Sequence, residues 1–71
     1  MGYDLYFINE TKRQIAHSKV LPGGFEYGAA LLAYLSRCQG DTIRIVGEDD
    51  ALVEAEQFSE APAYEQIDLS T

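Results

Sequence analysis

The chain has 71 residues, 46% of them hydrophobic, and a formal net charge of −7 at pH 7. Its length allows a single compact domain over residues 1–71 with a thin core, since a chain this short buries only about 60% of its unfolded surface. The apolar fraction excludes intrinsic disorder. Because the acidic charge repels phosphates, we expect no direct contact with nucleic acid and none with a membrane.

Cysteine usage and the absence of targeting signals indicate where the chain works. Cys38 is the only cysteine, so no internal disulfide can form, which is typical of a reducing compartment. No run approaches the roughly 18 apolar residues of a membrane span, and residues 1–10 do not resemble a signal peptide. We therefore expect a cytoplasmic protein.

The first two predicted elements form a hairpin. Residues 3–10, YDLYFINE, alternate in the manner of a strand, and the polar segment 9–13 is typical of a turn. Residues 14–20 predict a second strand that pairs with the first. The pattern does not decide whether the face with Ile15 or the face with Ala16 and Val20 is buried, because a one-residue shift in strand pairing exchanges the two faces.

A helix is predicted over residues 25–38, which are dense in alanine and leucine. Leu31, Leu35 and Cys38 fall on one stripe and are the expected core contacts. The opposite face is bare rather than charged, with Ala30 and Ala33 as its small residues.

Three shorter elements follow. Residues 41–47 predict a strand, for which we expect a central place in the sheet, and residues 49–60 predict a short helix that Pro62 ends. On its helical wheel Ala51, Ala55 and Phe58 share the apolar arc, whereas the carboxylates surround Val53. Residues 63–70 predict the last strand.

The sequence therefore predicts an α+β fold, a small single domain of order β-β-α-β-(short α)-β. Its sheet is mainly antiparallel, with one principal helix packed on one face. The other sheet face is expected to carry Tyr6, Arg44 and Tyr64.

The sequence contains no pattern that indicates catalysis, a cofactor or a metal. His17 is the only histidine and has no motif around it, and Cys38 is expected to be a buried structural thiol. A single histidine and a single cysteine do not make a zinc ligand set. The glycines at 23, 24 and 28 lack the phosphate-loop spacing. We expect no enzyme activity, no catalytic residue, no cofactor and no metal.

Charge placement is the strongest functional signal. Residues 1–40 hold four basic and three acidic groups, whereas residues 41–71 hold one basic and nine acidic groups. Segment 48–60 has six carboxylates and no lysine or arginine. A solvated helix face explains such a run as well as a binding surface does. The candidate partner-binding residues are Glu48, Asp49, Asp50, Val53, Glu54, Glu56 and Glu60.

These candidates divide by their local roles. Asp49 or Asp50 can cap the first turn of the short helix, which weakens them as evidence for a partner. Glu54, Glu56 and Glu60 have no such role. Val53 among them, with the aromatic rings of Tyr64 and Phe58 nearby, is the predicted apolar anchor.

The first functional hypothesis is a small non-enzymatic acidic binding protein, an inhibitor or adaptor that occupies a basic surface of a partner protein. A nucleic-acid-binding enzyme or a toxin is such a partner, and immunity proteins and phage anti-defence factors are comparable in size and charge. The spacing of the carboxylates permits mimicry of nucleic acid. The alternative is a homo-oligomeric structural or accessory module, for example a homodimer, that associates through the Ala30/Ala33 helix face and the Tyr-rich sheet face.

Overall fold

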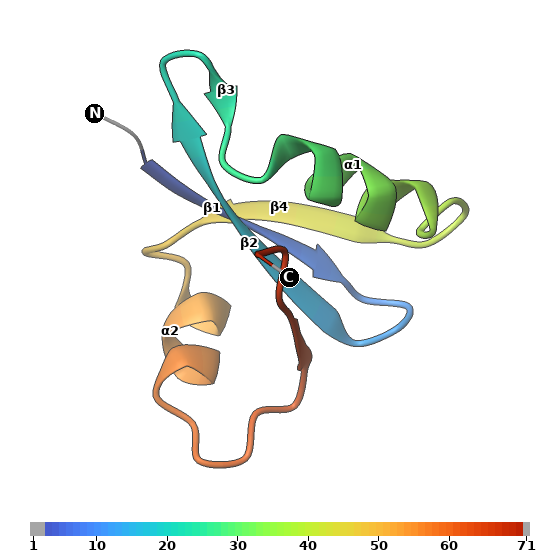
Figure 1. Cartoon of the computed structure of the whole chain (residues 1–71). Helices are drawn as coiled ribbons and strands as arrows, with labels where there is room; N and C mark the ends of the chain where they lie inside the picture. The colour runs from blue at the N-terminus through green and yellow to red at the C-terminus, as the bar shows by residue number, and fades with distance from the viewer. Residues whose placement is uncertain (1–2, 71) are drawn as a thin grey trace.

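The computed structural model describes residues 3–70, which form a five-stranded sheet and two helices (Figure 1). The sheet order is β3-β2-β1-β4, and β5 also pairs with β2, in parallel. The predicted α+β fold and its order of elements are confirmed, with the two-residue β3 as an addition. The elements are β1 (Tyr3–Asn9), β2 (Gln14–Leu21), β3 (Gly24–Phe25), α1 (Gly28–Ser36), β4 (Ile43–Gly47), α2 (Ala51–Gln57) and β5 (Glu65–Ile67).

The predicted hairpin is present, with β1 and β2 antiparallel from the pair Tyr3↔Val20 to the pair Asn9↔Gln14. Arg13 completes its turn in the left-handed region, with φ of 57°. In this position the Arg13 guanidinium lies over the Tyr64 ring, 4.6 Å from its centroid. The hairpin tip therefore also holds the segment that leads into β5, through a cation–π contact.

The sheet has a hydrophobic core on each face. Both faces of β2 are therefore buried, which the sequence could not decide. Ile15 is 4% exposed and Ala16 is fully buried, although the two side chains point to opposite faces. On the first face, Phe7 and Ala16 pack with Leu31 and Tyr34 of α1. On the second face, a separate cluster fills the space below α2: Ile8, Ile15, Val53 and Tyr64.

The second core corrects the expectation of an open Tyr-rich sheet face. Tyr6 does lie on that face, but it is partly buried against the second cluster. Tyr64 is 6% exposed and belongs to the covering layer rather than to the sheet. Figure 1 shows α2 on the side of the sheet away from α1. Tyr64 is therefore a core residue and Tyr6 packs against that core, so the two rings do not form an open face.

Helix α1 is shorter than predicted. Phe25 pairs with Val20 in β3, and Tyr27 adopts φ of 56°, so the helix begins only at Gly28. Ala30 packs against the first core, whereas Ala33 is exposed. The predicted bare face Ala30/Ala33 is therefore half buried.

The exposed side of α1 consists of uncharged residues. Leu32 is its largest member and is 69% exposed. Ala29, Ala33 and Ser36 are exposed around it. This side of α1 therefore presents an apolar surface centred on Leu32.

The strand over residues 43–47 was expected to be central and lies instead at an edge of the sheet. β4 pairs only with β1, and the other side of β1 is occupied by β2. The two remaining short strands, β3 and β5, occupy the far edge of β2. Burial follows this position, since Ile45 in the middle of β4 is 60% exposed.

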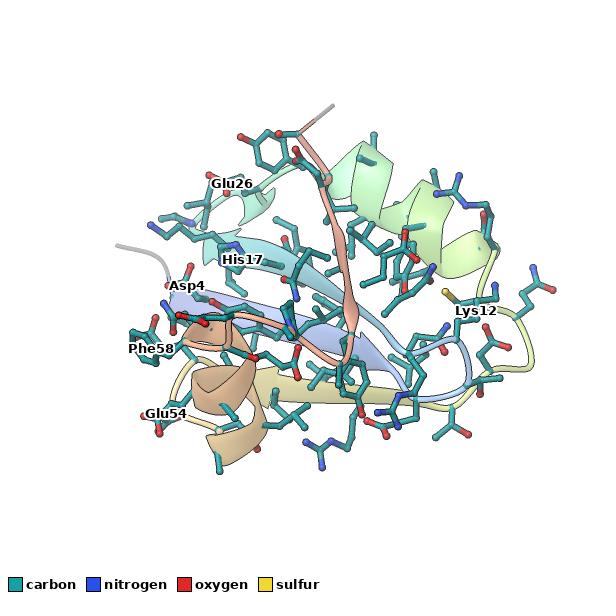
Figure 2. The ribbon with its side chains drawn as sticks, turned by 90° about the horizontal axis from the view of Figure 1, so that it is seen from below. Asp4, Lys12, His17, Glu26, Glu54 and Phe58 are labelled. Carbon is teal, nitrogen blue, oxygen red and sulfur yellow. The ribbon has the colours of Figure 1, made fainter. Side chains whose placement is uncertain are left out.

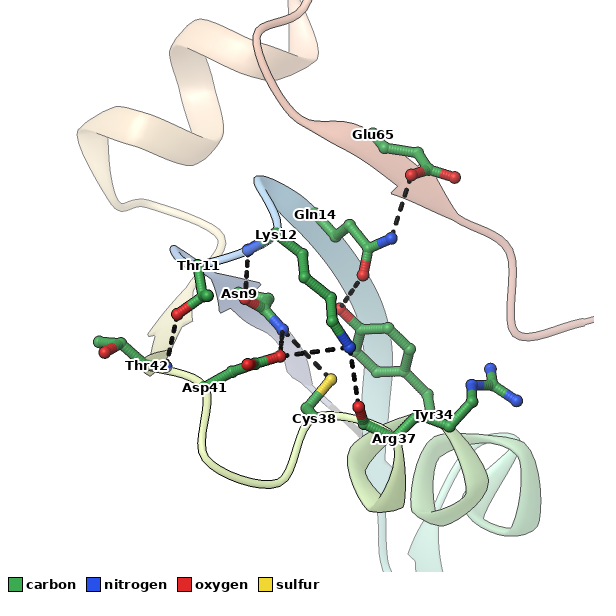
Figure 3. Close-up of polar contacts among 10 residues, drawn as sticks. All are labelled: Asn9, Thr11, Lys12, Gln14, Tyr34, Arg37, Cys38, Asp41, Thr42 and Glu65. Atoms are coloured by element: carbon green, nitrogen blue, oxygen red, sulfur yellow. Dashed lines mark hydrogen bonds and ion pairs between the residues drawn. The ribbon is translucent and has the colours of Figure 1, made fainter.

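A fully buried asparagine connects four parts of the chain (Figure 3). The Asn9 amide nitrogen donates to Asp41 Oδ2 at 2.8 Å and lies 3.3 Å from Cys38 Sγ, while its oxygen accepts from Lys12 N at 2.8 Å. The hydrogen bond from Asn9 is the main cause of the lowered pKa of Asp41, and Lys12 adds to it. Cys38 is the buried structural thiol that the sequence predicted.

Replacing Asn9 by alanine is expected to destabilise the fold by about 2–3 kcal/mol, because the Lys12 amide and the Asp41 carboxylate lose a partner. The measurement is the free energy of unfolding from urea denaturation. Gln39→Ala, an exposed amide deletion, is the control and should change it by less than about 0.5 kcal/mol. Equal effects of the two substitutions would show that the Asn9 network contributes nothing.

Candidate functional site

The acidic segment begins in the turn that joins β4 to α2, where Asp50 caps the helix. Asp50 Oδ1 accepts a hydrogen bond from Leu52 N at 2.9 Å. The same oxygen lies 3.4 Å from a guanidinium nitrogen of Arg44 on β4. Asp50 is thus engaged within the chain, in the capping role that its position in the sequence predicted. Glu48 and Asp49 are exposed beside it.

Helix α2 is turned differently from the prediction. Val53, the predicted anchor, is only 2% exposed and packs in the second core, with Leu52 beside it. The arc that was expected to be buried faces solvent instead: Ala51, Ala55 and Phe58 are all exposed. The assignment of Val53 to a partner-binding surface is therefore wrong, because its side chain is inside the protein.

Glu56 has a structural role that the sequence did not reveal. Its two carboxylate oxygens accept hydrogen bonds from the backbone N–H groups of Ala63 and Tyr64, at 3.1 and 3.2 Å. These bonds fix the loop after α2 and position the buried Tyr64 ring. Glu56 is half-buried, and its charge is directed at backbone donors rather than at solvent.

Besides Glu48 and Asp49, two further predicted carboxylates and one aromatic ring are open to solvent. Within residues 3–70, the carboxylates of Glu54 and Glu60 have no side-chain partner. Phe58 follows Glu54 by one helical turn and is 81% exposed, more than any other large hydrophobic residue described. Figure 2 shows Glu54 and Phe58 on the same side of the molecule as Asp4.

A hydrogen-bonded Asp4–His17 pair that the sequence did not predict lies at the opposite end of this surface. His17 Nε2 is 2.7 Å from Asp4 Oδ1, and the His17 ring stacks on Tyr6 with centroids 4.8 Å apart. The hydrogen bond to His17 is the largest cause of the lowered pKa of Asp4. The pKa of Glu48 is raised, mainly because its carboxyl group shares a hydrogen bond with Asp4 and feels the Asp4 charge.

A shallow pocket of about 240 Å³ opens between α2 and the sheet. Its volume is below the roughly 300–1,000 Å³ of typical small-molecule sites. Although Asp4 orients His17 as a carboxylate orients a general base, no serine, threonine or cysteine borders the pocket to act as a nucleophile. The lining residues are Tyr6, Ile15, His17, Val53, Glu56, Gln57 and Gln66.

Two further searches of residues 3–70 gave negative results. Nowhere in this range do three His, Cys, Asp or Glu side chains gather closely enough to hold a metal ion. Neither α1 nor α2 combines the length and the apolar character that a membrane-crossing helix needs.

Comparison of the chain with known protein families, with curated proteins and with solved structures found no match. The functional argument therefore depends on the residues and contacts described above.

The candidate surface differs from the predicted one by five residues. Val53 is removed by burial, Asp50 and Glu56 are removed because their carboxylates are engaged within the chain, and Phe58 and Asp4 are added. Hairpin pairing contained the signal for the Asp4 group, because Tyr6 and His17 are directly opposite in the register and Asp4 shares their face. The sequence named Phe58 as a possible anchor beside Val53 and Tyr64, but it could not select Phe58 among them, because the exposure of each side chain depends on how α2 is rotated. We use "α2 surface" for the resulting set: Asp4, Glu48, Asp49, Glu54, Phe58 and Glu60.

The two glutamates of α2 are expected to contribute differently to the free energy of unfolding. Glu56→Ala should lower the free energy of unfolding by about 1–3 kcal/mol, because two backbone N–H groups lose their acceptor. Glu54→Ala, at an exposed position of the same helix, should change it by less than about 0.5 kcal/mol. Chemical denaturation followed by circular dichroism measures both, and a cost at Glu54 that equals the cost at Glu56 would contradict these roles.

Glu48 should also make stability depend on pH. Its pKa is raised above the ordinary value of 4.5 in the folded chain, so the folded state binds a proton there more tightly than the unfolded state does. That contribution is present at acid pH and is lost as pH rises through the raised pKa. Glu48→Gln keeps a hydrogen-bond donor but cannot ionise. The melting temperature of the variant relative to the wild type should therefore increase between about pH 4 and pH 7.

Glu60→Gln is the control for the pH experiment, because Glu60 has no side-chain partner within residues 3–70. Its difference from the wild type should stay constant over the same range. A constant difference for Glu48→Gln as well would mean that Asp4 and Glu48 do not interact in solution.

Proposed function

We propose that the chain is a small non-enzymatic binding protein that occupies a basic surface of a partner protein through the α2 surface. The observation that carries the proposal is Phe58. A phenylalanine that is 81% exposed costs solvation free energy in the free protein, and contact with a partner recovers it.

The surroundings of Phe58 specify the charge of the partner. Glu54 lies one turn before it and Glu60 two residues after it, and neither carboxylate has a side-chain partner within residues 3–70. An aromatic anchor within a charged rim is the usual anatomy of a specific protein interface. Because the rim is acidic, lysine and arginine side chains complement it, and they also relieve the repulsion among the carboxylates.

The α2 surface also favours an inhibitor or adaptor over a catalyst. The exposed groups are an aromatic ring, small alanines and carboxylates, which are suited to contact rather than to bond-breaking. Proteins that bind nucleic acid carry basic surfaces of the required sign, so an enzyme that acts on nucleic acid, or a basic toxin, fits this description.

The proposal is tested with the immobilised chain and a partner captured from its native cells. Phe58→Ala should weaken binding by about tenfold to a hundredfold, in the range of an interface hot spot. The double charge reversal Glu54→Lys with Glu60→Lys should abolish binding, and added salt should slow association, because salt screens the attraction between exposed charges.

Glu26→Lys is the matched control, since it reverses a carboxylate that Figure 2 shows far from Glu54. Binding should survive this change. A partner that is lost with Glu26→Lys to the same degree, or that is retained by Phe58→Ala and by the double reversal, does not use the α2 surface, and the proposal is then wrong.

A further inference from the structure

The free edge of β4 offers unused backbone hydrogen-bonding groups. β4 pairs with β1 on one side, and no other strand of residues 3–70 lies on its other side. Glu10 N donates to Thr42 O at 2.9 Å, which fixes the alternation of the antiparallel ladder. In this alternation Arg44 and Val46 turn their backbone groups toward β1. The backbone N–H groups of Ile43, Ile45 and Gly47 consequently point out from the sheet.

An apolar surface lies next to this edge. Ile45 is opposite Phe7 and therefore shares the sheet face that α1 covers, yet it is 60% exposed. Tyr34, on one flank of α1, reaches Gln14 of β2 with its hydroxyl group. Ile45 is thus an exposed aliphatic residue in the middle of the open edge.

We propose that two copies of this chain associate by antiparallel pairing of β4 with β4, around a two-fold axis at Ile45. The two sheets then join into one, and the unused N–H and C=O groups of each edge find partners in the other copy. Ile45 meets Ile45 of the second copy, on the face of the sheet that α1 covers. Glu48 is the one residue that this edge shares with the α2 surface, whereas Phe58 and Glu54 lie outside it, so the inference does not depend on the proposed function.

The charges on β4 select this register over its neighbour. With the axis at Ile45, Arg44 is opposite Val46 of the second copy and diagonal to Glu48 of the second copy, on the same face of the joined sheet. Two Arg44–Glu48 contacts form by symmetry. A shift that moves the axis to Arg44 would place the two arginines opposite each other, which is unfavourable. The edge is therefore complementary to itself in both shape and charge.

Hydrogen exchange of the wild-type chain tests the pairing directly. The amides of Ile43, Ile45 and Gly47 should exchange fast in dilute protein and become protected as the concentration rises toward millimolar. Arg44 and Val46, which face β1, should be protected at every concentration. Outward amides whose exchange is fast and independent of concentration throughout this range would overturn the proposal.

Sedimentation equilibrium of variants gives a second, independent measurement. Ile45→Pro removes one outward N–H and leaves the β1 ladder intact, because that N–H does not face β1. It should raise the dissociation constant of the dimer at least about tenfold, since each copy loses a hydrogen bond to the other. Ile45→Val is the control and should associate like the wild type. A dimer that is unchanged by Ile45→Pro would contradict β4 pairing.

A charge swap tests the register. Arg44→Glu and Glu48→Arg should each weaken association, because each places like charges side by side. The double variant Arg44→Glu with Glu48→Arg should restore association to near the wild-type constant. A double variant that associates more weakly than both single variants would exclude this register.

Discussion

The hydrogen bonds of one buried amide, Asn9, hold the arrangement of the sheet and α1 together. Asn9 ends β1, and its side chain reaches the hairpin turn at Lys12, the approach to β4 at Asp41 and the end of α1 at Cys38. A fully buried polar group is costly unless all its donors and acceptors are used, so this site tolerates few other arrangements. In a domain with a thin core, these hydrogen bonds define the relative positions of β1, α1 and β4. Hydrophobic contacts are less directional and would define those positions less strictly.

Sequence periodicity predicted the helices and strands well, but it predicted poorly which of their faces are buried and where each strand lies in the sheet. The hairpin, the main helix and the α+β class follow from local alternation and helix propensity, which depend on neighbouring residues only. Periodicity could not decide which face of β2 is buried, because Ile15 and Ala16 are both buried. The edge position of β4 was equally beyond prediction, since it depends on which strands fill the far side of β2.

Helix α2 shows why a helical wheel does not by itself determine a buried face. The arc of Ala51, Ala55 and Phe58 looks like a core face, yet Leu52 and Val53 are the residues that pack inward. Burial of two aliphatic side chains contributes about 3–6 kcal/mol, which exceeds what Phe58 alone would contribute. With this face turned inward, Glu56 is also partly buried. Its hydrogen bonds from the backbone N–H groups of Ala63 and Tyr64 offset the cost of that burial. Part of the acidic signal in the sequence is therefore structural.

Under the two proposals, the remaining carboxylates and the one nearby cation would give the two exposed surfaces different partners. Arg44 is the only basic residue among residues 41–71, and it lies on β4 with Asp50 and Glu48 near it. At that edge a second acidic copy meets a cation as well as carboxylates, so like-charge repulsion is least there. Glu54 and Glu60, which flank Phe58, have no cationic partner within residues 3–70, so this region would repel another copy of the chain and attract a basic protein. Although Glu48 belongs to both proposed contacts, pairing through β4 would leave Phe58 and Glu54 free for a partner, and a dimer would present two such sites.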